Sequence, residues 1–281
     1  MTGRTVVITG ASDGIGAVAA RRLHDAGDTV VVVGRSPQKT KAVAGALGVA
    51  SVTADFSRLD DVRELASTLL DRYDRIDVLA NNAGGIFGDR TLTVDGNETT
   101  FQVNHLAPFL LTHLLQNRLS ESNARILNTS SVANTRFAKF DISDLNLENG
   151  YTENRAYGNA KLANILFTTE LHRRYADDGI SAAAFHPGVV ATNFADGSTT
   201  AMRHLYRSVF RFLLTSPEQG SDTLVWLAQA APGVDWVSGA YYAKRQIAKA
   251  NPLAYDTALA SELWEKSAAL VGIPSAAPDR H

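Results

Sequence analysis

Tyr157 and Lys161 lie four residues apart in the segment RAYGNAKLANILF, whose composition predicts a buried helix. A spacing of four residues places the phenol and the ammonium on the same face of a helix. A neighbouring ammonium stabilises a phenolate, so Lys161 is expected to lower the pKa of Tyr157 from about 10 towards neutrality. Such a tyrosine can donate a proton to a carbonyl oxygen, or accept one from an alcohol, near physiological pH. The pair therefore predicts acid–base chemistry.

The composition excludes several other kinds of function. The chain has 281 residues, 45% of them hydrophobic, and its 27 Lys and Arg nearly balance 29 Asp and Glu, so no basic field favours nucleic acid as a partner. It has no cysteine, and its histidines have no metal-binding spacing, so no metal is expected. No apolar run approaches the roughly 20 residues of a membrane span, and the first predicted strand leaves no room for a signal peptide. We expect a cytoplasmic protein without an integral membrane segment.

Short runs rich in Val, Ile and Leu alternate with helical patterns along the chain. The predicted strands are 5–9, 29–33, 49–54, 76–80, 125–129 and 181–185, and the predicted helices include 15–26, 37–47, 59–73, 98–119 and the one that contains Tyr157. Continuously apolar strands that alternate with helices indicate right-handed βαβ units and a parallel sheet buried on both faces. The fold class is therefore α/β, a single doubly wound (Rossmann) parallel sheet with helices on both faces, in one domain over residues 1–281. Ligands of such sheets bind at the carboxyl ends of the strands.

A glycine-rich loop follows the first predicted strand. It contains Gly10, Ser12, Asp13, Gly14, Ile15 and Gly16, and a helix is predicted directly after it. Glycines at this junction let the backbone turn tightly and let a pyrophosphate approach the N–H groups of the helix. An ordinary glycine-rich turn is the alternative, but the position between strand and helix favours a dinucleotide site.

The end of the second predicted strand indicates which dinucleotide is bound. NAD enzymes usually carry an acidic residue here, whereas this chain has Gly34 followed by Arg35. A guanidinium suits a 2′-phosphate, so NADP is favoured, although Asp13 adds no attraction for a phosphate. Asp55 and Phe56, after the third strand, are predicted cofactor contacts. Asp55 would accept a hydrogen bond from the adenine amino group, or else cap the following helix.

Further motifs follow these in a fixed order. TGASDGIG at 9–16, NNAG at 81–84, the serine pair at 130–131, Tyr157 with Lys161, and PGVVAT at 187–192 together resemble the short-chain dehydrogenase/reductase family over nearly the whole chain. The segments VNHLAPFLLT, RILNTSSVAN, YGNAKLANILFTTEL and HPGVV are similar to its retinol-dehydrogenase-like branch.

The resemblance implies a nicotinamide-dependent oxidoreductase with a set of four catalytic residues. Tyr157 would be the acid/base and Lys161 its electrostatic partner, Ser131 would orient the substrate oxygen, and Asn104 would hold a water that links Lys161 to solvent. Further cofactor contacts would come from Asn82, Ala83, Gly84, Pro187, Gly188, Val190 and Thr192, besides Tyr157 and Lys161. Structural roles remain open: Asn104 would then pin a helix bend, Ser131 would bond the backbone at a strand end, and His186 would be a structural histidine.

Two segments bear on the substrate and on assembly. Ser131 and Tyr157 are 26 residues apart, about twice the spacing in much of the family, so residues 136–154 are expected to loop over the mouth of the site. This loop would obstruct a helical surface that many members use to form tetramers, which favours a monomer or dimer. Residues 193–216 are expected to form a substrate lid whose apolar helical face favours a lipophilic carbonyl or alcohol. A helix at 202–214 that packs on its own core, or lies on a membrane surface, is the alternative.

The leading hypothesis is an NADP-dependent carbonyl reductase or alcohol dehydrogenase. A non-catalytic NADP-binding regulator on the same fold is the alternative from a different class, although Tyr157 and Lys161 argue against it. A sugar-nucleotide epimerase would need a longer C-terminal part, and a pterin or quinone reductase is the closer rival. The substrate and the direction of the reaction are not readable from the sequence.

Overall fold

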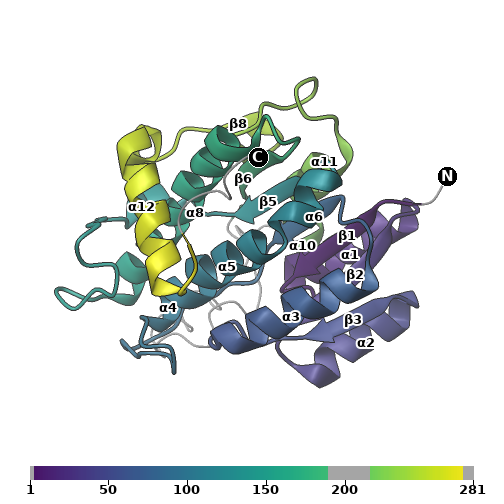
Figure 1. Cartoon of the computed structure of the whole chain (residues 1–281), viewed down its shortest axis with the longest axis horizontal. Helices are drawn as coiled ribbons and strands as arrows, with labels where there is room; N and C mark the ends of the chain where they lie inside the picture. The colour runs from purple at the N-terminus through teal and green to yellow at the C-terminus, as the bar shows by residue number, and fades with distance from the viewer. Residues whose placement is uncertain (1–2, 189–215, 275–281) are drawn as a thin grey trace.

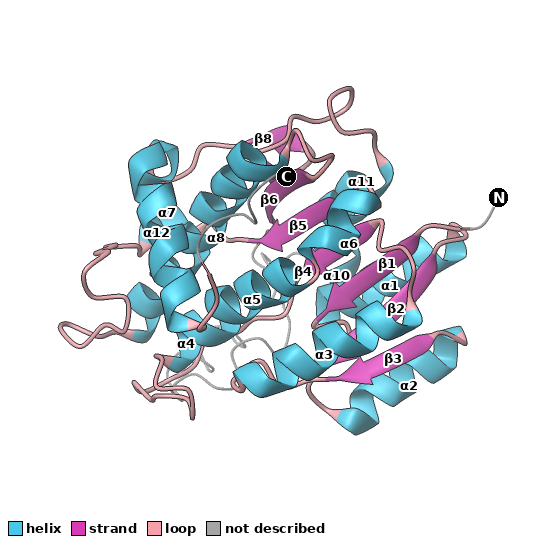
Figure 2. Ribbon diagram, viewed as in Figure 1, coloured by secondary structure: helices cyan, strands magenta, loops and turns pink. Residues whose placement is uncertain are grey.

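One eight-stranded sheet, in the order β3-β2-β1-β4-β5-β6-β7-β8, organises the computed structural model, which describes residues 3–188 and 216–274. The strands are β1 Thr5–Thr9, β2 Thr29–Gly34, β3 Ala50–Thr53, β4 Val78–Asn81, β5 Arg125–Thr129, β6 Ser181–His186, β7 Tyr241–Ala243 and β8 Gln246–Ile247. All neighbours pair in parallel except β7 with β8, and the arrowheads of β1, β3 and β5 point the same way in Figure 2. The α/β fold class predicted from the sequence is confirmed.

Helices cover both faces of this sheet (Figure 1). They are α1 Gly14–Asp25, α2 Pro37–Leu47, α3 Leu59–Arg72, α4 Thr99–Phe101, α5 Ala107–Leu114, α6 Gln116–Glu121, α7 Ala133–Arg136, α8 Glu153–Tyr175, α10 Pro217–Gly220, α11 Asp222–Gln229 and α12 Thr257–Leu270, with a 3-10 turn at Pro252–Tyr255. Neighbouring residues of β1 point to opposite faces: Val6 packs with side chains of α1 and α11, and Val7 with side chains of α3, α5, α8 and α12. Burial on both faces explains why the strands are continuously apolar.

The long helix predicted at 98–119 is interrupted. The π-helix η1 spans Gln102–Leu106, between α4 and α5. Pro108 has no backbone N–H and cannot donate to the carbonyl of Asn104, four residues earlier, as an α-helix requires. A π-helix, whose bonds span five residues, accommodates this missing donor. The interruption matters because it holds Asn104, one of the predicted catalytic residues.

The start of α2 agrees with the helix predicted at 37–47, and serine residues cap both α2 and α10. Ser36 caps α2, which begins at Pro37, and Ser216 caps α10, which begins at Pro217. Both serine side chains accept a hydrogen bond from the backbone N–H three residues later. Within residues 3–188 and 216–274, no helix combines the length and the apolar character needed to cross a membrane.

Candidate active site

The glycine-rich loop between β1 and α1 lies where the strand order reverses, between β1 and β4. Gly10 has a φ of +65°, and a Cβ there would lie 2.7 Å from the Cα of Ala83. A Cβ at Gly16 would lie 2.4 Å from the carbonyl oxygen of Gly10. The loop is therefore packed backbone against backbone, and its glycines are a steric requirement of this arrangement. Such a cradle at a topological switch point suits the pyrophosphate of a dinucleotide.

The segment after β4 braces this loop. The side chain of Asn82 donates to the carbonyl oxygens of Thr9 and Gly10, at 3.0 and 3.3 Å. The backbone N–H groups of Asn82 and Ala83 both donate to Oγ1 of Thr9, at 2.9 and 3.0 Å. Asn82 and Ala83, predicted as cofactor contacts, thus also hold the glycine loop in place. Thr9 is a supporting residue that the sequence analysis did not single out.

Asp13 and Lys39 form an ion pair beside the loop. Oδ1 of Asp13 accepts a hydrogen bond from the N–H of Gly14, at 2.8 Å, and so caps α1. Nζ of Lys39 lies 3.3 Å from Oδ2 of Asp13, and both side chains are more than half exposed. Lys39 therefore offsets the negative charge that counted against a phosphate in the sequence. Arg35 is exposed at the end of β2, next to Gly34, where a Cβ would lie 2.7 Å from the Cβ of Ser12.

Asp55 does not cap the helix that follows it. Its Oδ1 accepts hydrogen bonds from the N–H and the hydroxyl of Ser57, at 3.0 and 2.8 Å, which closes a local turn. The N-cap of α3 is Arg58, and Oδ2 of Asp95 accepts from the N–H of Leu59 instead, at 3.0 Å. The helix-cap alternative for Asp55 is therefore wrong, because a distant loop supplies that cap. The side chain of Phe56 is buried, and the cofactor contacts of both residues stay predictions.

Tyr157 and Lys161 lie on α8, which Thr152 caps by accepting from the N–H of Arg155. Tyr157 is 8% exposed and Lys161 only 1%. Nζ of Lys161 lies 5.4 Å from the centre of the Tyr157 ring and donates to the carbonyl oxygen of Thr129, at 3.0 Å. Burial lowers the pKa of Lys161 to about 7, because an ammonium is costly in an apolar interior. The predicted pair thus shares one buried place on the helix, at the end of β5.

Asn104 lies against Gly84 and Lys161 in the middle of η1. Its Nδ2 donates to the carbonyl oxygens of Thr100 and Gly85, at 2.8 and 2.9 Å, and its Oδ1 accepts from the N–H of Gly85, at 3.2 Å. A Cβ on Gly84 would lie 2.4 Å from Oδ1 of Asn104 and 3.3 Å from Nζ of Lys161. Asn104 therefore pins a helix bend, as the structural alternative proposed, and also lies beside Lys161. Its backbone carbonyl lacks an α-helical donor because of Pro108.

The two serines after β5 have different partners. The hydroxyl of Ser130 is buried and donates to the carbonyl oxygen of Lys161, at 2.6 Å. Oγ of Ser131 is partly exposed and accepts from the N–H of Ala133, at 3.2 Å, in the turn that leads into α7. Ser130 thus fixes the helix, and Ser131 keeps its hydroxyl hydrogen available to a substrate oxygen.

The segment after β6 is described only in part. Nδ1 of His186 accepts from the N–H of Gly188, at 3.3 Å, and burial, with Arg136 and Lys244, lowers the pKa of His186 to about 4. A neutral, hydrogen-bonded imidazole agrees with the structural interpretation of His186. Pro187 and Gly188 lie directly after β6, at the carboxyl edge of the sheet. The other two predicted contacts of this segment, Val190 and Thr192, lie outside the described residues.

Comparison with known proteins assigns the family. A family model described as short chain dehydrogenase matches residues 4–203. The chain belongs to the short-chain dehydrogenase family. It is 45% identical, over 97% of its length and 94% of the relative's, to a Streptomyces sp. (strain C5) protein provisionally named daunorubicin C-13 ketoreductase. It is 36% identical to human retinol dehydrogenase 13, over 96% of this chain and 85% of that protein, which supports the retinol-dehydrogenase-like branch.

Solved structures agree with this assignment. An uncharacterised protein from Mycobacterium paratuberculosis is 33% identical, with a TM-score of 0.78 over 98% of this chain and 95% of that one. A metagenomic short-chain oxidoreductase solved in complex with NADP is 26% identical, with a TM-score of 0.61 over 82% and 92% of the two chains. The chain is thus an oxidoreductase of a family whose members bind nicotinamide dinucleotides.

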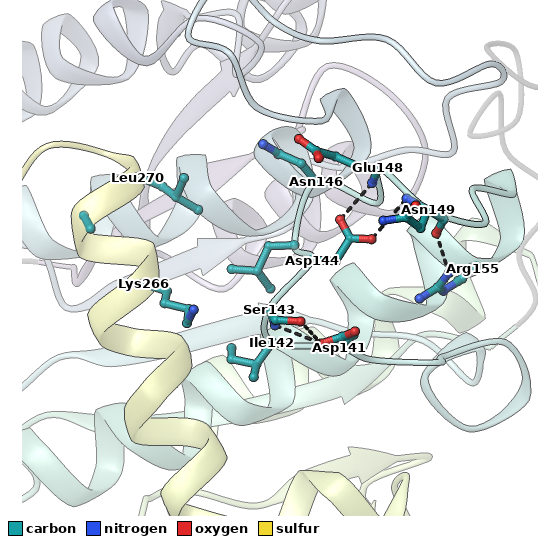
Figure 3. Close-up of a pocket in the computed structure, with 12 residues that line it drawn as sticks. Asp141, Ile142, Ser143, Asp144, Asn146, Glu148, Asn149, Arg155, Lys266 and Leu270 are labelled. Carbon is teal, nitrogen blue, oxygen red and sulfur yellow. Dashed lines mark hydrogen bonds between the residues drawn. The ribbon is translucent and has the colours of Figure 1, made fainter.

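Residues 136–154, which lengthen the chain between Ser131 and Tyr157, pack partly against α8. A Cβ on Gly158 would lie 2.6 Å from the backbone nitrogen of Ala138, so the chain crosses directly beside Tyr157. The segment then turns towards α12, where a cavity of about 590 Å³ opens between residues 141–149, Arg155 and the end of that helix (Figure 3). Neither Tyr157 nor Lys161 lines this cavity, so it is separate from the candidate active site.

The described residues hold no group of three or more His, Asp or Glu side chains arranged for a metal.

Two further partners of the site were not identified from the sequence. The carbonyl oxygen of Thr129 accepts from Lys161 and also from Nδ2 of Asn164, at 3.0 Å each. A backbone acceptor has no sequence signal of its own. Asn164, however, lies three residues after Lys161 and seven after Tyr157, so the helical spacing that selects the pair also selects Asn164.

Proposed function

We propose that this chain is an NADP-dependent oxidoreductase that interconverts a carbonyl and an alcohol on a lipophilic small molecule. Tyr157 is the acid/base, and Lys161, Ser131 and Asn104 complete the catalytic set. The observation that carries the proposal is the burial of Lys161 between the Tyr157 ring, Gly84 and Asn104. A buried lysine without a paired carboxylate is costly, and such groups are concentrated at functional sites.

The residues present fit the cofactor. The glycine loop leaves no room for a side chain at Gly10 or Gly16, and Gly14 has a φ of +55°, which favours glycine; the N–H groups at the start of α1 suit a pyrophosphate. Arg35, with Lys39 nearby on α2, would bind the 2′-phosphate, and Gly34 lets the side chains of Ser12 and Thr40 approach the end of β2 closely. Asn82, Gly84, Pro187 and Gly188 would line the rest of the site, with Ile15, Asp55, Phe56, Ala83, Val190 and Thr192. Bound NADPH supplies a hydride from its nicotinamide ring.

The side chains of this protein manage the proton and the developing charge. Tyr157 donates its phenolic proton to the carbonyl oxygen as negative charge develops there, and the hydroxyl of Ser131 donates a hydrogen bond to the same oxygen. Lys161 stabilises the phenolate that Tyr157 leaves behind. Asn104 would hold a water that returns a proton through Lys161. The reverse sequence oxidises an alcohol.

The names of two relatives support a lipophilic substrate. One is named for reduction at C-13 of daunorubicin and the other for retinol, and both names denote largely apolar molecules. The apolar residues predicted in the lid at 193–216 point the same way, although 193–215 lie outside the described residues. We propose that this chain acts on the same class of lipophilic substrate, without assigning either compound to it.

The assembly and the cellular context remain proposals of the same kind. α12 packs on α5 and α8 through Trp264, whose ring centre lies 4.9 Å from that of Phe109 and 5.8 Å from that of Phe167. The segment 136–154, which passes beside α8 at Gly158, would obstruct the helical surface by which many family members form tetramers, and this favours a monomer or dimer. We also retain the single domain over 1–281 and the cytoplasmic location.

The test combines cofactor binding with turnover. Quenching of intrinsic fluorescence on titration with NADPH and NADH gives two dissociation constants. NADPH oxidation at 340 nm is then followed with all-trans-retinal, daunorubicin and a series of long-chain aldehydes and steroid ketones. We expect tighter binding of NADPH than of NADH and turnover of at least one carbonyl. Binding without any turnover would favour a non-catalytic NADP-binding regulator, and a preference for NADH would contradict the role given to Arg35.

A further inference from the structure

The carbonyl oxygen of Thr129 holds two donors from the same helix. Nζ of Lys161 and Nδ2 of Asn164 each lie 3.0 Å from it, and all three residues are buried. A carbonyl oxygen has two lone pairs, so Lys161 and Asn164 together occupy its accepting capacity. When two donors share one carbonyl oxygen, each weakens the hydrogen bond of the other, because both draw on the same electron density of the oxygen. The strength with which Thr129 holds the Lys161 ammonium therefore depends on Asn164.

The other end of the Asn164 amide faces a buried histidine. Oδ1 of Asn164 and Nδ1 of His105 are both buried and have no hydrogen-bond partner at normal distance within the described residues. Burial lowers the pKa of His105 to about 3, and Asn164 opposes this shift, which places the amide beside the imidazole. His105 is therefore neutral at physiological pH, with a single N–H.

The contact of the second nitrogen of His105 indicates which tautomer the surroundings favour. Nε2 lies 2.9 Å from the hydroxyl of Ser267 on α12. A serine hydroxyl can donate to Nε2, and the imidazole proton is then on Nδ1, directed to the acceptor Oδ1 of Asn164. With the opposite tautomer, two acceptors would face each other. The hydrogen bonds of His105 to Ser267 and of Asn164 to Thr129, together with the contact between His105 and Asn164, thus link Ser267 to the acceptor of Lys161.

We propose that Asn164 is a positioning residue for Lys161, acting through the shared Thr129 carbonyl, and that His105 holds the Asn164 amide in the orientation this requires. The proposal rests on the role given to Lys161 in the proposed function. His105 directly follows Asn104 in η1, so the same contacts connect the two residues that flank Gly84. They thereby couple the π-helix and α8, which together hold the proton path.

The expected signature is a shift in the pH at which Lys161 titrates. Tyr157 on α8 is the titratable side chain beside it, while the neutral His105 on η1 lies next to Asn164. Among the described residues, no carboxylate or other cation contributes to its shift. In Asn164→Leu the Thr129 carbonyl serves Lys161 alone, so its ammonium is held more firmly and its pKa rises. Thr168→Val is the matched control. It removes a buried hydroxyl one turn further along α8, which bonds Asn128 and the carbonyl of Asn164, and it leaves both bonds to Thr129 in place.

The first measurement needs neither cofactor nor substrate. The free energy of unfolding in urea is measured between pH 6 and pH 10 for both variants and for the original protein. Because burial holds the pKa of Lys161 near 7 in the folded state, below its ordinary 10.5, stability rises with pH above about 7. In Asn164→Leu the rise should begin at least about half a pH unit higher, and in Thr168→Val it should begin at the original pH. If the stability of Asn164→Leu begins to rise at the original pH or at a lower pH, the proposal is overturned.

A second variant keeps the test open if Asn164→Leu does not fold. His105→Phe retains a ring among Phe101, Phe109 and Phe167 but removes the N–H that faces Asn164. We expect a smaller shift in the same direction, and a double variant that shifts no further than Asn164→Leu alone. Additive shifts would overturn the role of His105.

The loaded enzyme gives the second readout. With NADPH and whichever carbonyl of the panel is reduced fastest, kcat of Asn164→Leu should fall at least about tenfold, a change of about 1.4 kcal/mol in the activation barrier. The alkaline limb of the pH profile of kcat should also lie at higher pH than in the original protein. An unchanged limb contradicts the proposal. If no carbonyl is turned over by the original protein, the proposed function fails, while the cofactor-free measurement still decides the role of Asn164.

Discussion

The glycine loops and the α8 face meet at the carboxyl edge of the sheet, but they are built in different ways. The loops at 10–16 and 82–84 are shaped by backbone packing, in which a Cβ at Gly10 or Gly16 would come within 2.7 Å of another backbone atom. The α8 face, meaning the buried polar side chains of Lys161 and Asn164 on α8 and of Asn104 on η1, is shaped by hydrogen bonds to the backbone carbonyl groups of Thr129, Gly85 and Thr100. The first arrangement suits the recognition of a common group such as a phosphate, and the second suits the control of a proton.

This difference predicts separate consequences for mutations in the two regions. Changes on the α8 face should lower turnover and leave cofactor binding largely intact. Changes in the cofactor region should affect binding first. A substitution at a residue where the two regions are in contact should lower both turnover and cofactor binding.

Gly84→Ala is expected to have the largest combined effect. Its new Cβ would lie 2.4 Å from Oδ1 of Asn104, so Asn104 or the loop must move. A displacement of this kind costs on the order of 100-fold in turnover, and overpacking costs about 1–3 kcal/mol of stability. Steady-state kinetics and urea unfolding test both effects. Gly45→Ala is the control, because a Cβ there meets nothing within 4 Å; unchanged kinetics in both variants would contradict the contact between the two regions.

Lys161→Met separates catalysis from stability. Turnover should fall by a factor of about 100 or more, since Tyr157 loses its electrostatic partner. The folded state holds the pKa of Lys161 near 7 and the unfolded state near 10.5, so the unfolded chain binds the extra proton between these values. The original protein should therefore gain stability as pH rises through this window, and Lys161→Met should not. Equal pH slopes in urea unfolding would show that Lys161 titrates normally.

Arg35→Ala tests the cofactor region with a smaller effect. The exposed guanidinium is expected to bind the 2′-phosphate, so the dissociation constant of NADPH should rise about tenfold while that of NADH stays unchanged. Lys41→Ala removes another exposed cation, on α2, and controls for the general charge of this surface. Equal weakening of NADPH and NADH in Arg35→Ala would remove the basis for NADP preference.

Gly45→Ala itself carries the smallest prediction. Gly45 is exposed near the C-terminal end of α2, and alanine there loses less conformational freedom on folding. We expect stability to increase by about 0.5–1 kcal/mol, measured by urea unfolding. A loss of stability would mean that this helix end is more constrained than its open surroundings indicate.

The same comparison explains how much could be predicted from the sequence. The strands, the glycine loop and the pairing of Tyr157 with Lys161 follow from local patterns, since apolar runs, glycine spacing and helical periodicity act over a few residues. The helix predicted at 98–119 is present but contains the π-helical segment Gln102–Leu106, because apolar periodicity does not report the donor that Pro108 lacks. The cap role of Asp55 was wrong because Asp95, 36 residues after Leu59 in the chain, accepts from the N–H of Leu59 instead.

The polar network of the α8 face was the least predictable part. The acceptor of Lys161 is a backbone carbonyl, and the partners of Asn164 come from β5 and η1, which only the folded topology brings together. Asn164 had a helical signal relative to Lys161, yet spacing alone does not distinguish a core amide from one that bonds a catalytic neighbour. The substrate lid depends on residues that the structure does not describe.

The most direct test of the central claim measures binding and turnover on the same preparation of Tyr157→Phe. Phenylalanine keeps the ring beside Lys161 and removes only the hydroxyl that would transfer the proton. Turnover of NADPH with the best carbonyl of the panel should fall by about 1000-fold, while the NADPH dissociation constant stays within about threefold of the original. Retention of more than about a tenth of the original turnover would contradict the assignment of Tyr157 as the acid/base.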